Sequence, residues 1–116
     1  VEGMGGIMTP ILQDYFVTNL IKDMKLPTII VTRTKVGTIN HTIMTCKMCE
    51  KYKIPIKGIV INNFDVKGYD VKDLKRDLEN LTNVPVLGSI PFIDDLGDAS
   101  LYRVFKKNIN FKYLLS

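Results

Sequence analysis

Short runs dominated by aliphatic and β-branched residues recur along this chain and limit the folds open to it. Residues 28–32 (TIIVT), 57–62 (KGIVIN) and 84–90 (VPVLGSI) form three such runs. A strand with one solvated face alternates between apolar and polar residues, whereas a strand buried on both faces reads as a nearly continuous apolar run. Val1 has the character of the last residue of another such strand. The runs therefore predict a parallel sheet.

Stretches with helical periodicity lie between these runs. Apolar residues recur every three or four positions in residues 15–24, 38–52 and 71–81. A last helix is expected over 100–107, and the apolar tail 111–115 is expected to form one docking turn. Alternating strands and helices predict an α/β fold, a parallel sheet with flanking helices joined by right-handed crossovers. We expect the whole chain, 1–116, to be a single α/β domain.

Ligands of such sheets bind at the carboxyl ends of the strands. Glu2, at the first of these ends, is followed by a glycine-rich turn that contains Gly3 and Gly5. A carboxylate at this place can hold Mg²⁺ near a phosphate, and glycines allow backbone N–H groups to approach an anion. The same residues also suit a tight strand-to-loop turn with an exposed Glu.

Two further strand ends carry polar or turn residues. Gly37 and Thr38 open a helix whose N-terminus can bind an anion such as a carboxylate, with Asn40 as an added donor, although an ordinary capped helix fits as well. Asn62 ends a strand, and its amide complements an adenine edge, but Asn also starts turns. Pro91 and Phe92 follow the last strand and can cover a planar base.

Composition and missing motifs exclude several functions. The net charge of +4 comes from scattered basic residues, so we expect no nucleic-acid partner, and no apolar run is long enough to cross a membrane. Cys46 and Cys49 fall within a helical stretch and are expected to be packing residues of a reduced, cytoplasmic protein. The chain contains no G-x-x-x-x-G-K-[ST] loop and no G-x-G-x-x-G, so if the site handles ATP phosphates, the half that binds them is not on this chain.

Several motifs in a fixed order resemble dethiobiotin synthetase. They are VEGMGG, LPTIIVTR, VGTINHT, GIVINN and VPVLGSIP, and together they extend from residue 1 to about residue 98. EGxGG alone is shared with related ATP-dependent enzymes such as the cobyrinic acid synthases, whereas GTINHT is particular to dethiobiotin synthetase.

The resemblance implies a P-loop-type α/β domain that works as a homodimer. It also implies a reaction in which ATP and Mg²⁺ drive the joining of CO₂ to 7,8-diaminopelargonate. A carbamate forms, is phosphorylated and closes to the ureido ring in biotin biosynthesis.

The resemblance also assigns roles to residues that match the family's motifs. Glu2 matches the Mg²⁺ ligand, and Gly5 matches a position that lines the nucleotide and substrate cleft. The loop that grips the tail carboxylate of the substrate from the partner subunit corresponds to Gly37, Thr38, Ile39 and Asn40. Asn62 matches the residue that reads adenine. The other positions expected near the nucleotide are Gly3, Asn63, Pro91, Phe92, Ile93 and Asp98.

The family's N-terminal half, with its P-loop, second metal-binding Asp and carbamate-steadying Lys, has no counterpart in this sequence. We therefore expect the chain to be the C-terminal half of the enzyme, as a truncated form, a proteolytic remnant or one subunit of a split enzyme. Alone it should bind nucleotide weakly and be inactive. Two alternatives stay open: a related cobyrinic acid synthase-like enzyme with a different acceptor loop at 36–42, and a non-catalytic dimerisation or regulatory module.

Overall fold

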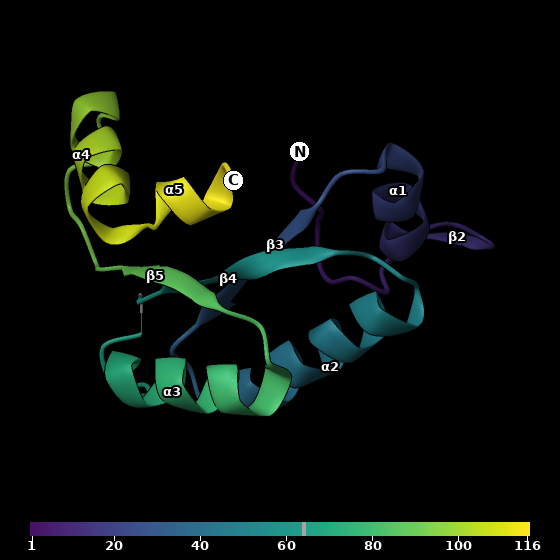
Figure 1. Ribbon diagram of the computed structural model, residues 1–116, viewed down its shortest axis with the longest axis horizontal. Helices are drawn as coiled ribbons and strands as arrows, with labels where there is room; N and C mark the ends of the chain where they lie inside the picture. Colours follow the sequence, from purple (N-terminus) through teal and green to yellow (C-terminus); the bar gives the residue numbers. More distant parts are fainter. Residues whose placement is uncertain (64) are drawn as a thin grey trace.

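A computed structural model describes residues 1–63 and 65–116 and shows a parallel sheet with helices on both sides (Figure 1). Its strands are β3 (Thr28–Arg33), β4 (Ile56–Asn62) and β5 (Val86–Ile90), and they lie in the order β3-β4-β5. Both pairs are parallel. The α/β fold class that the sequence predicts is therefore confirmed, and each predicted strand lies within two residues of its expected bounds.

Two helices, α2 (Thr38–Lys51) and α3 (Val71–Thr82), cover one face of the sheet (Figure 1). Alternate residues of a strand point to the same face, and residues four apart share one side of a helix. Ile59 and Ile61 of β4 are thus brought against Leu74 and Leu78 of α3, and all of these side chains are fully buried. This cluster is the main core, and it fixes the carboxyl ends of the strands relative to the start of α2.

The other face carries α4 (Asp98–Asn108) and α5 (Phe111–Leu114), which lie beside β5 (Figure 1). The link between these helices crosses the strand closely, because Gly88 forms an antiparallel bridge with Ile109. The backbone N–H of residue 110 donates to the carbonyl oxygen of Leu87 over 2.8 Å. Ile109 is buried with Leu87 and Ile90 in a second apolar cluster. The predicted docking turn at 111–115 is confirmed as α5.

The first residues depart from the prediction in two ways. Residues 15–16 were expected to begin a helix, but they form β2 (Tyr15–Phe16), which pairs with β1 (Pro10–Leu12) in a small hairpin. The helix α1 (Val17–Met24) begins after it, because the Asn19 side chain accepts a hydrogen bond from the Phe16 N–H over 2.7 Å. The strand end expected at Val1 is wrong for this chain, since Val1 is 98% exposed and belongs to no strand.

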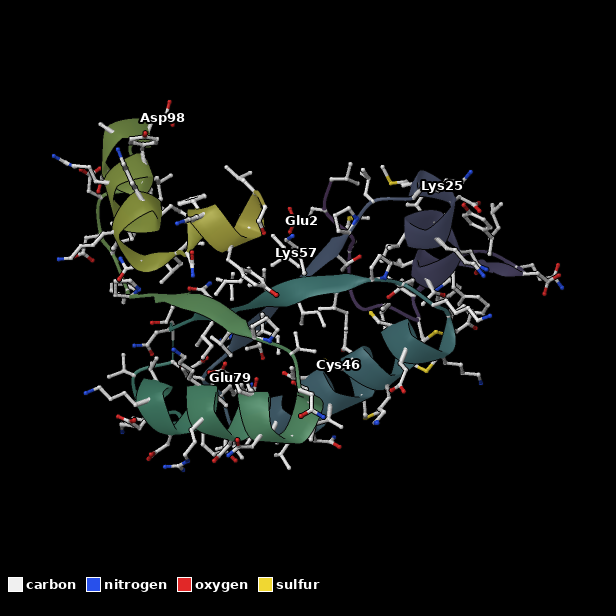
Figure 2. All side chains as sticks on the ribbon, viewed as in Figure 1. Glu2, Lys25, Cys46, Lys57, Glu79 and Asp98 are labelled. Carbon is white, nitrogen blue, oxygen red and sulfur yellow. The ribbon has the colours of Figure 1, made fainter. Side chains whose placement is uncertain are left out.

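Both cysteines are buried on α2 and unbridged, which confirms the packing interpretation. Burial raises the pKa of the Cys46 thiol, and it raises the pKa of Cys49 to about 11. A thiol of this kind stays protonated at neutral pH and is a poor nucleophile. Both cysteines are therefore buried packing residues, and Cys46 belongs to the main core below the sheet (Figure 2). None of the helices in the described part of the chain combines the length and hydrophobicity that a membrane span requires.

Candidate nucleotide and carboxylate site

The turn between β3 and α2 exposes the N-terminus of a long helix. Gly37 is the N-cap residue and has a φ of 94°, a left-handed conformation that costs little only for glycine. Having no side chain, it provides no cap. The Thr38 N–H donates to the carbonyl oxygen of Lys35 over 3.1 Å. Because the first N–H groups of a helix have no intrahelical acceptor, those of Ile39 and Asn40 remain available to an anion.

The residues of this turn contribute in different ways. Asn40 is exposed, and its amide can add a donor beside the helix end. Thr38, by contrast, is only 6% exposed, and its hydroxyl lies 2.6 Å from the hydroxyl of Thr32 in the interior. A ligand at this helix end can therefore meet the N–H groups of Ile39 and Asn40 but not the side-chain oxygen of Thr38.

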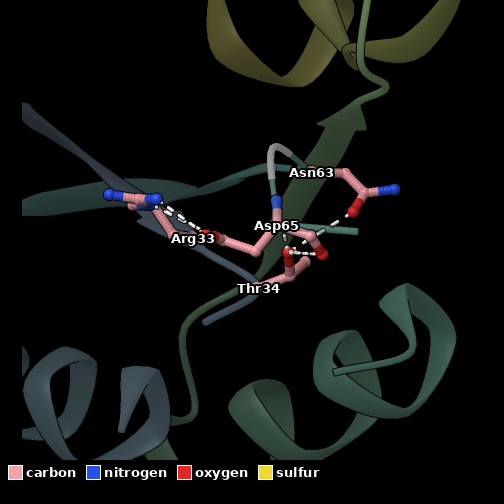
Figure 3. A network of polar contacts seen from close by, with 4 residues as sticks. All are labelled: Arg33, Thr34, Asn63 and Asp65. Carbon is pink, nitrogen blue, oxygen red and sulfur yellow. Dashed lines mark hydrogen bonds and ion pairs between the residues drawn. The ribbon is translucent and has the colours of Figure 1, made fainter. Parts of the chain in front are cut away.

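A polar network joins this turn to the loop after β4 (Figure 3). The guanidinium of Arg33 binds the carboxylate of Asp65 through two hydrogen bonds, of 2.7 and 3.2 Å. The Thr34 hydroxyl accepts from the Asp65 N–H at 3.3 Å and lies within reach of the Asn63 side-chain oxygen at 3.4 Å. The Tyr69 N–H donates to the carbonyl oxygen of Thr34 over 2.7 Å. The two loops at the carboxyl edge are therefore held together.

Replacing Asp65 with asparagine should lower the urea midpoint of unfolding modestly at pH 7. The hydrogen bond from Arg33 holds the pKa of the Asp65 carboxyl below its usual value, so the ionised form stabilises the folded state. This contribution is complete above the unfolded pKa of about 3.9 and is lost as pH falls through the lower folded pKa. In urea titrations, the difference in midpoint between wild type and variant should therefore be smaller at pH 3 than at pH 7.

Glu50→Gln is the control for this measurement. It breaks an ion pair with Lys47 whose side chains are 75% and 70% exposed, and such pairs contribute little. If Asp65→Asn lowers the urea midpoint at pH 7 no more than Glu50→Gln does, the network does not stabilise the fold.

A groove of about 530 Å³ lies where β4 and β5 end. This volume is typical of a small-molecule site. Its walls are mostly apolar, and Asn62 supplies an amide at the strand end. The remaining residues that line it are Val31, Val60, Ile90, Pro91, Phe92, Ile93, Asp94, Leu96, Leu101 and Phe105. Asn62, Pro91, Phe92 and Ile93 lie together along this groove, with the Asp94 carboxylate as a second polar group. Their role in binding a planar base stays a prediction.

Two residues predicted near the nucleotide lie elsewhere. Asn63 does not line the groove, because its side chain turns toward Thr34 and its N–H donates to the Ile90 carbonyl oxygen over 2.8 Å. Asp98 is exposed in the first turn of α4, at the end of that helix far from the sheet (Figure 2). Their roles at the nucleotide stay predictions.

Glu2 is exposed and lies on the side of α1 and the start of the sheet, away from the groove at the carboxyl ends (Figure 2). Gly3 and Gly5 pack closely here, since a methyl group at Gly3 would lie 3.2 Å from Val17 and one at Gly5 2.7 Å from the Thr9 hydroxyl. Within the described residues no group of three or more His, Cys, Asp or Glu side chains could hold a metal. Mg²⁺ often takes only one or two carboxylates plus phosphate oxygens, so Glu2 fits as a single ligand at most.

Sequence reasoning missed two parts of this region. The pairing of Arg33 with Asp65 joins residues far apart in the chain, and only the parallel β3–β4 register brings them together. The contribution of Leu101 and Phe105 to the groove depends on how α4 folds back beside β5. The apolar side of α4 was the only signal for it in the sequence.

The chain is a parallel α/β sheet whose carboxyl edge, where such sheets bind ligands, carries a groove and an uncapped helix N-terminus. The family described as AAA domain matches residues 1–100, and the chain belongs to that family.

Among curated proteins, the chain resembles ATP-dependent dethiobiotin synthetases. It is 73% identical over 115 residues to that of Nitrosopumilus maritimus, an alignment covering 99% of this chain and 50% of that protein. It is 40% identical to that of Bacillus subtilis (strain 168), over 100% of this chain and 51% of the relative. The dethiobiotin synthetase resemblance is thus confirmed, and the chain spans about half the length of these relatives.

Proposed function

We propose that this chain forms the C-terminal half of a dethiobiotin synthetase, an ATP- and Mg²⁺-dependent ligase of biotin biosynthesis that works in the cytoplasm. The enzyme joins CO₂ to 7,8-diaminopelargonate and closes the ureido ring. One observation carries the proposal: the groove that ends at Asn62 and the uncapped start of α2 share one edge of the sheet, in a chain 73% identical to such an enzyme.

The groove and the start of α2, both at the carboxyl edge of the sheet, bind different parts of the reactants. The Asn62 amide donates to and accepts from the base, which Pro91 and Phe92 cover on one side. The N–H groups at the start of α2 hold the tail carboxylate of diaminopelargonate bound in a second copy of the enzyme, so the site is completed in a homodimer. Bound ATP with Mg²⁺ on its phosphates would supply the phosphoryl group that activates the carbamate oxygen. Glu2 lies away from the groove here, so it would serve as one Mg²⁺ ligand only if the first residues take another position beside the P-loop half.

A P-loop half is needed to complete this site. The sequence contains no phosphate-binding loop of the G-x-x-x-x-G-K-[ST] type. The face of β3 opposite α2 also leaves Ile29 39% and Val31 67% exposed. Strands of parallel sheets are normally covered on both faces. A partner half that covers this face and brings the P-loop to the carboxyl edge accounts for both observations.

A chimaeric enzyme tests the proposal. This chain replaces the matching half of the Nitrosopumilus maritimus dethiobiotin synthetase, where high identity favours a compatible interface. We expect ATP hydrolysis that depends on both diaminopelargonate and CO₂ and yields dethiobiotin, measured by phosphate release and mass spectrometry, with the unmodified relative as reference. The chain alone should show no turnover.

The two alternatives give different results in the same assay. A folded chimaera that hydrolyses ATP only with another amine or carboxylate acceptor would favour a cobyrinic acid synthase-like enzyme. A folded, dimeric chimaera without any ATP turnover would favour a non-catalytic module. Either outcome would overturn the proposal.

A further inference from the structure

Three threonine hydroxyls meet in the interior where β3 ends and α2 begins. The Thr32 hydroxyl lies 2.6 Å from that of Thr38 and 2.7 Å from that of Thr42. All three residues are buried, with exposed fractions of 6%, 6% and 3%. A hydroxyl donates one proton and accepts at two lone pairs, so Thr32 can satisfy both neighbours at once. We call these residues, Thr32, Thr38 and Thr42, the threonine hub.

The hub stands in place of a helix cap. Gly37 offers no side chain to the first turn of α2, so the usual polar bond that fixes a helix start is absent. Thr38 is the first helical residue and Thr42 follows one turn later, so both face β3 on the same side of the helix. Two short hydrogen bonds to one strand residue therefore determine where the helix begins and in which direction it points.

This placement sets the position of the N–H groups that the proposed function assigns to the substrate carboxylate. Hydrogen bonds between N–H groups and oxygen weaken when the distance exceeds about 3.2 Å, and a displacement of about 1 Å is enough to reduce activity strongly. Thr32 itself cannot contact the ligand, because its side chain is buried between the sheet and α2.

We propose that Thr32 is a positioning residue for substrate recognition: through the hydroxyls of Thr38 and Thr42 it fixes the first turn of α2 so that the turn can bind a carboxylate. This inference rests on the proposed function. It predicts that loss of the Thr32 hydroxyl weakens recognition of diaminopelargonate without affecting the nucleotide groove.

The test compares Thr32→Val with Thr32→Ser in the chimaeric enzyme. Valine keeps the shape of threonine and removes the hydroxyl, whereas serine keeps the hydroxyl and removes a methyl group. We expect Thr32→Val to raise the KM for diaminopelargonate about tenfold, the effect of about 1.4 kcal/mol. The KM of Thr32→Val for ATP should stay within about twofold of wild type. Thr32→Ser should have KM values near wild type for both substrates, because serine keeps the hydroxyl and its hydrogen bonds.

Thr82→Val controls for lost stability. Its hydroxyl bonds the Leu78 carbonyl oxygen over 2.6 Å at the end of α3, so its removal also weakens the fold but leaves α2 alone. Both KM values should remain unchanged. If Thr32→Val does not fold, Thr42→Val removes one arm of the hub and should raise the KM for diaminopelargonate about threefold, as a smaller displacement implies.

Two results would overturn the inference. In the first, Thr32→Val has the same KM for diaminopelargonate as the wild-type chimaera, or Thr42→Val does if Thr32→Val does not fold. The other is an equal rise in the KM values for both substrates. An inactive wild-type chimaera instead refutes the proposed function. In that case hydrogen exchange on the 116-residue chain tests the hub: Thr32→Val should speed exchange of the His41 amide, which bonds the Gly37 carbonyl oxygen, and Thr82→Val should not.

Discussion

Replacing Gly88 with alanine should lower the free energy of unfolding by about 3 kcal/mol or more, the range of severe overpacking. A methyl group at this position would overlap the carbonyl oxygen of Asn108, and the φ of 154° is one that residues with side chains rarely adopt. The obstacle is backbone, so no rotamer change can relieve it. Urea unfolding followed by circular dichroism measures the change.

The substitution should act mainly on the segment that crosses β5. Ile109 would lose its buried place beside Leu87 and Ile90, and α4 would be displaced from the groove to which it contributes Leu101 and Phe105. Nucleotide affinity should therefore fall together with stability. Gly6→Ala is the control, because a methyl group there comes no closer than 4.0 Å to Thr9. A stability for Gly88→Ala within about 0.5 kcal/mol of that of Gly6→Ala would contradict the close crossing.

The elements with strong local signals were predictable. The helix α3 has Leu74 and Leu78 four residues apart, Asp70 as an N-cap whose side chain accepts the Asp73 N–H, and Asn83 in a left-handed conformation at its end. Each of these signals lies in the sequence within a few residues of the helix. The hairpin of β1 and β2 has no such signal, because its strands have three and two residues and its loop lacks a typical turn pair.

The candidate site was predictable where strand ends alone define it. Asn62 ends β4 and Pro91 directly follows β5, so both lie at the carboxyl edge of one parallel sheet and line the groove. The inward rotation of Thr38 was not predictable, since helical position alone does not say which residue of a first turn faces the strand behind it. The position of Glu2 was not predictable either, because residue 2 belongs to no strand here and lies away from the carboxyl edge.

A single-atom change at the start of α2 should separate binding from stability. Asn40→Asp replaces an amide by a carboxylate of the same shape in the first turn of the helix. A negative charge there interacts favourably with the helix dipole, so stability should stay constant or rise by about 0.3–1 kcal/mol. The same charge would face the carboxylate of diaminopelargonate. Like charges about 4 Å apart repel by up to about 4 kcal/mol near a protein surface.

We therefore expect Asn40→Asp to raise the KM of the chimaeric enzyme for diaminopelargonate about 100-fold, since each 1.4 kcal/mol is about tenfold. Asn40→Ala removes only the amide donor and should raise the KM for diaminopelargonate about tenfold. The difference in KM between Asn40→Asp and Asn40→Ala therefore measures the effect of the charge. Asn80→Asp makes the same chemical change at an exposed position of α3 and should leave the KM unchanged. Added salt should reduce the difference in KM between Asn40→Asp and Asn40→Ala, because ions screen exposed charges. Equal KM values for these two variants at low salt would mean that the substrate carboxylate does not bind at the start of α2.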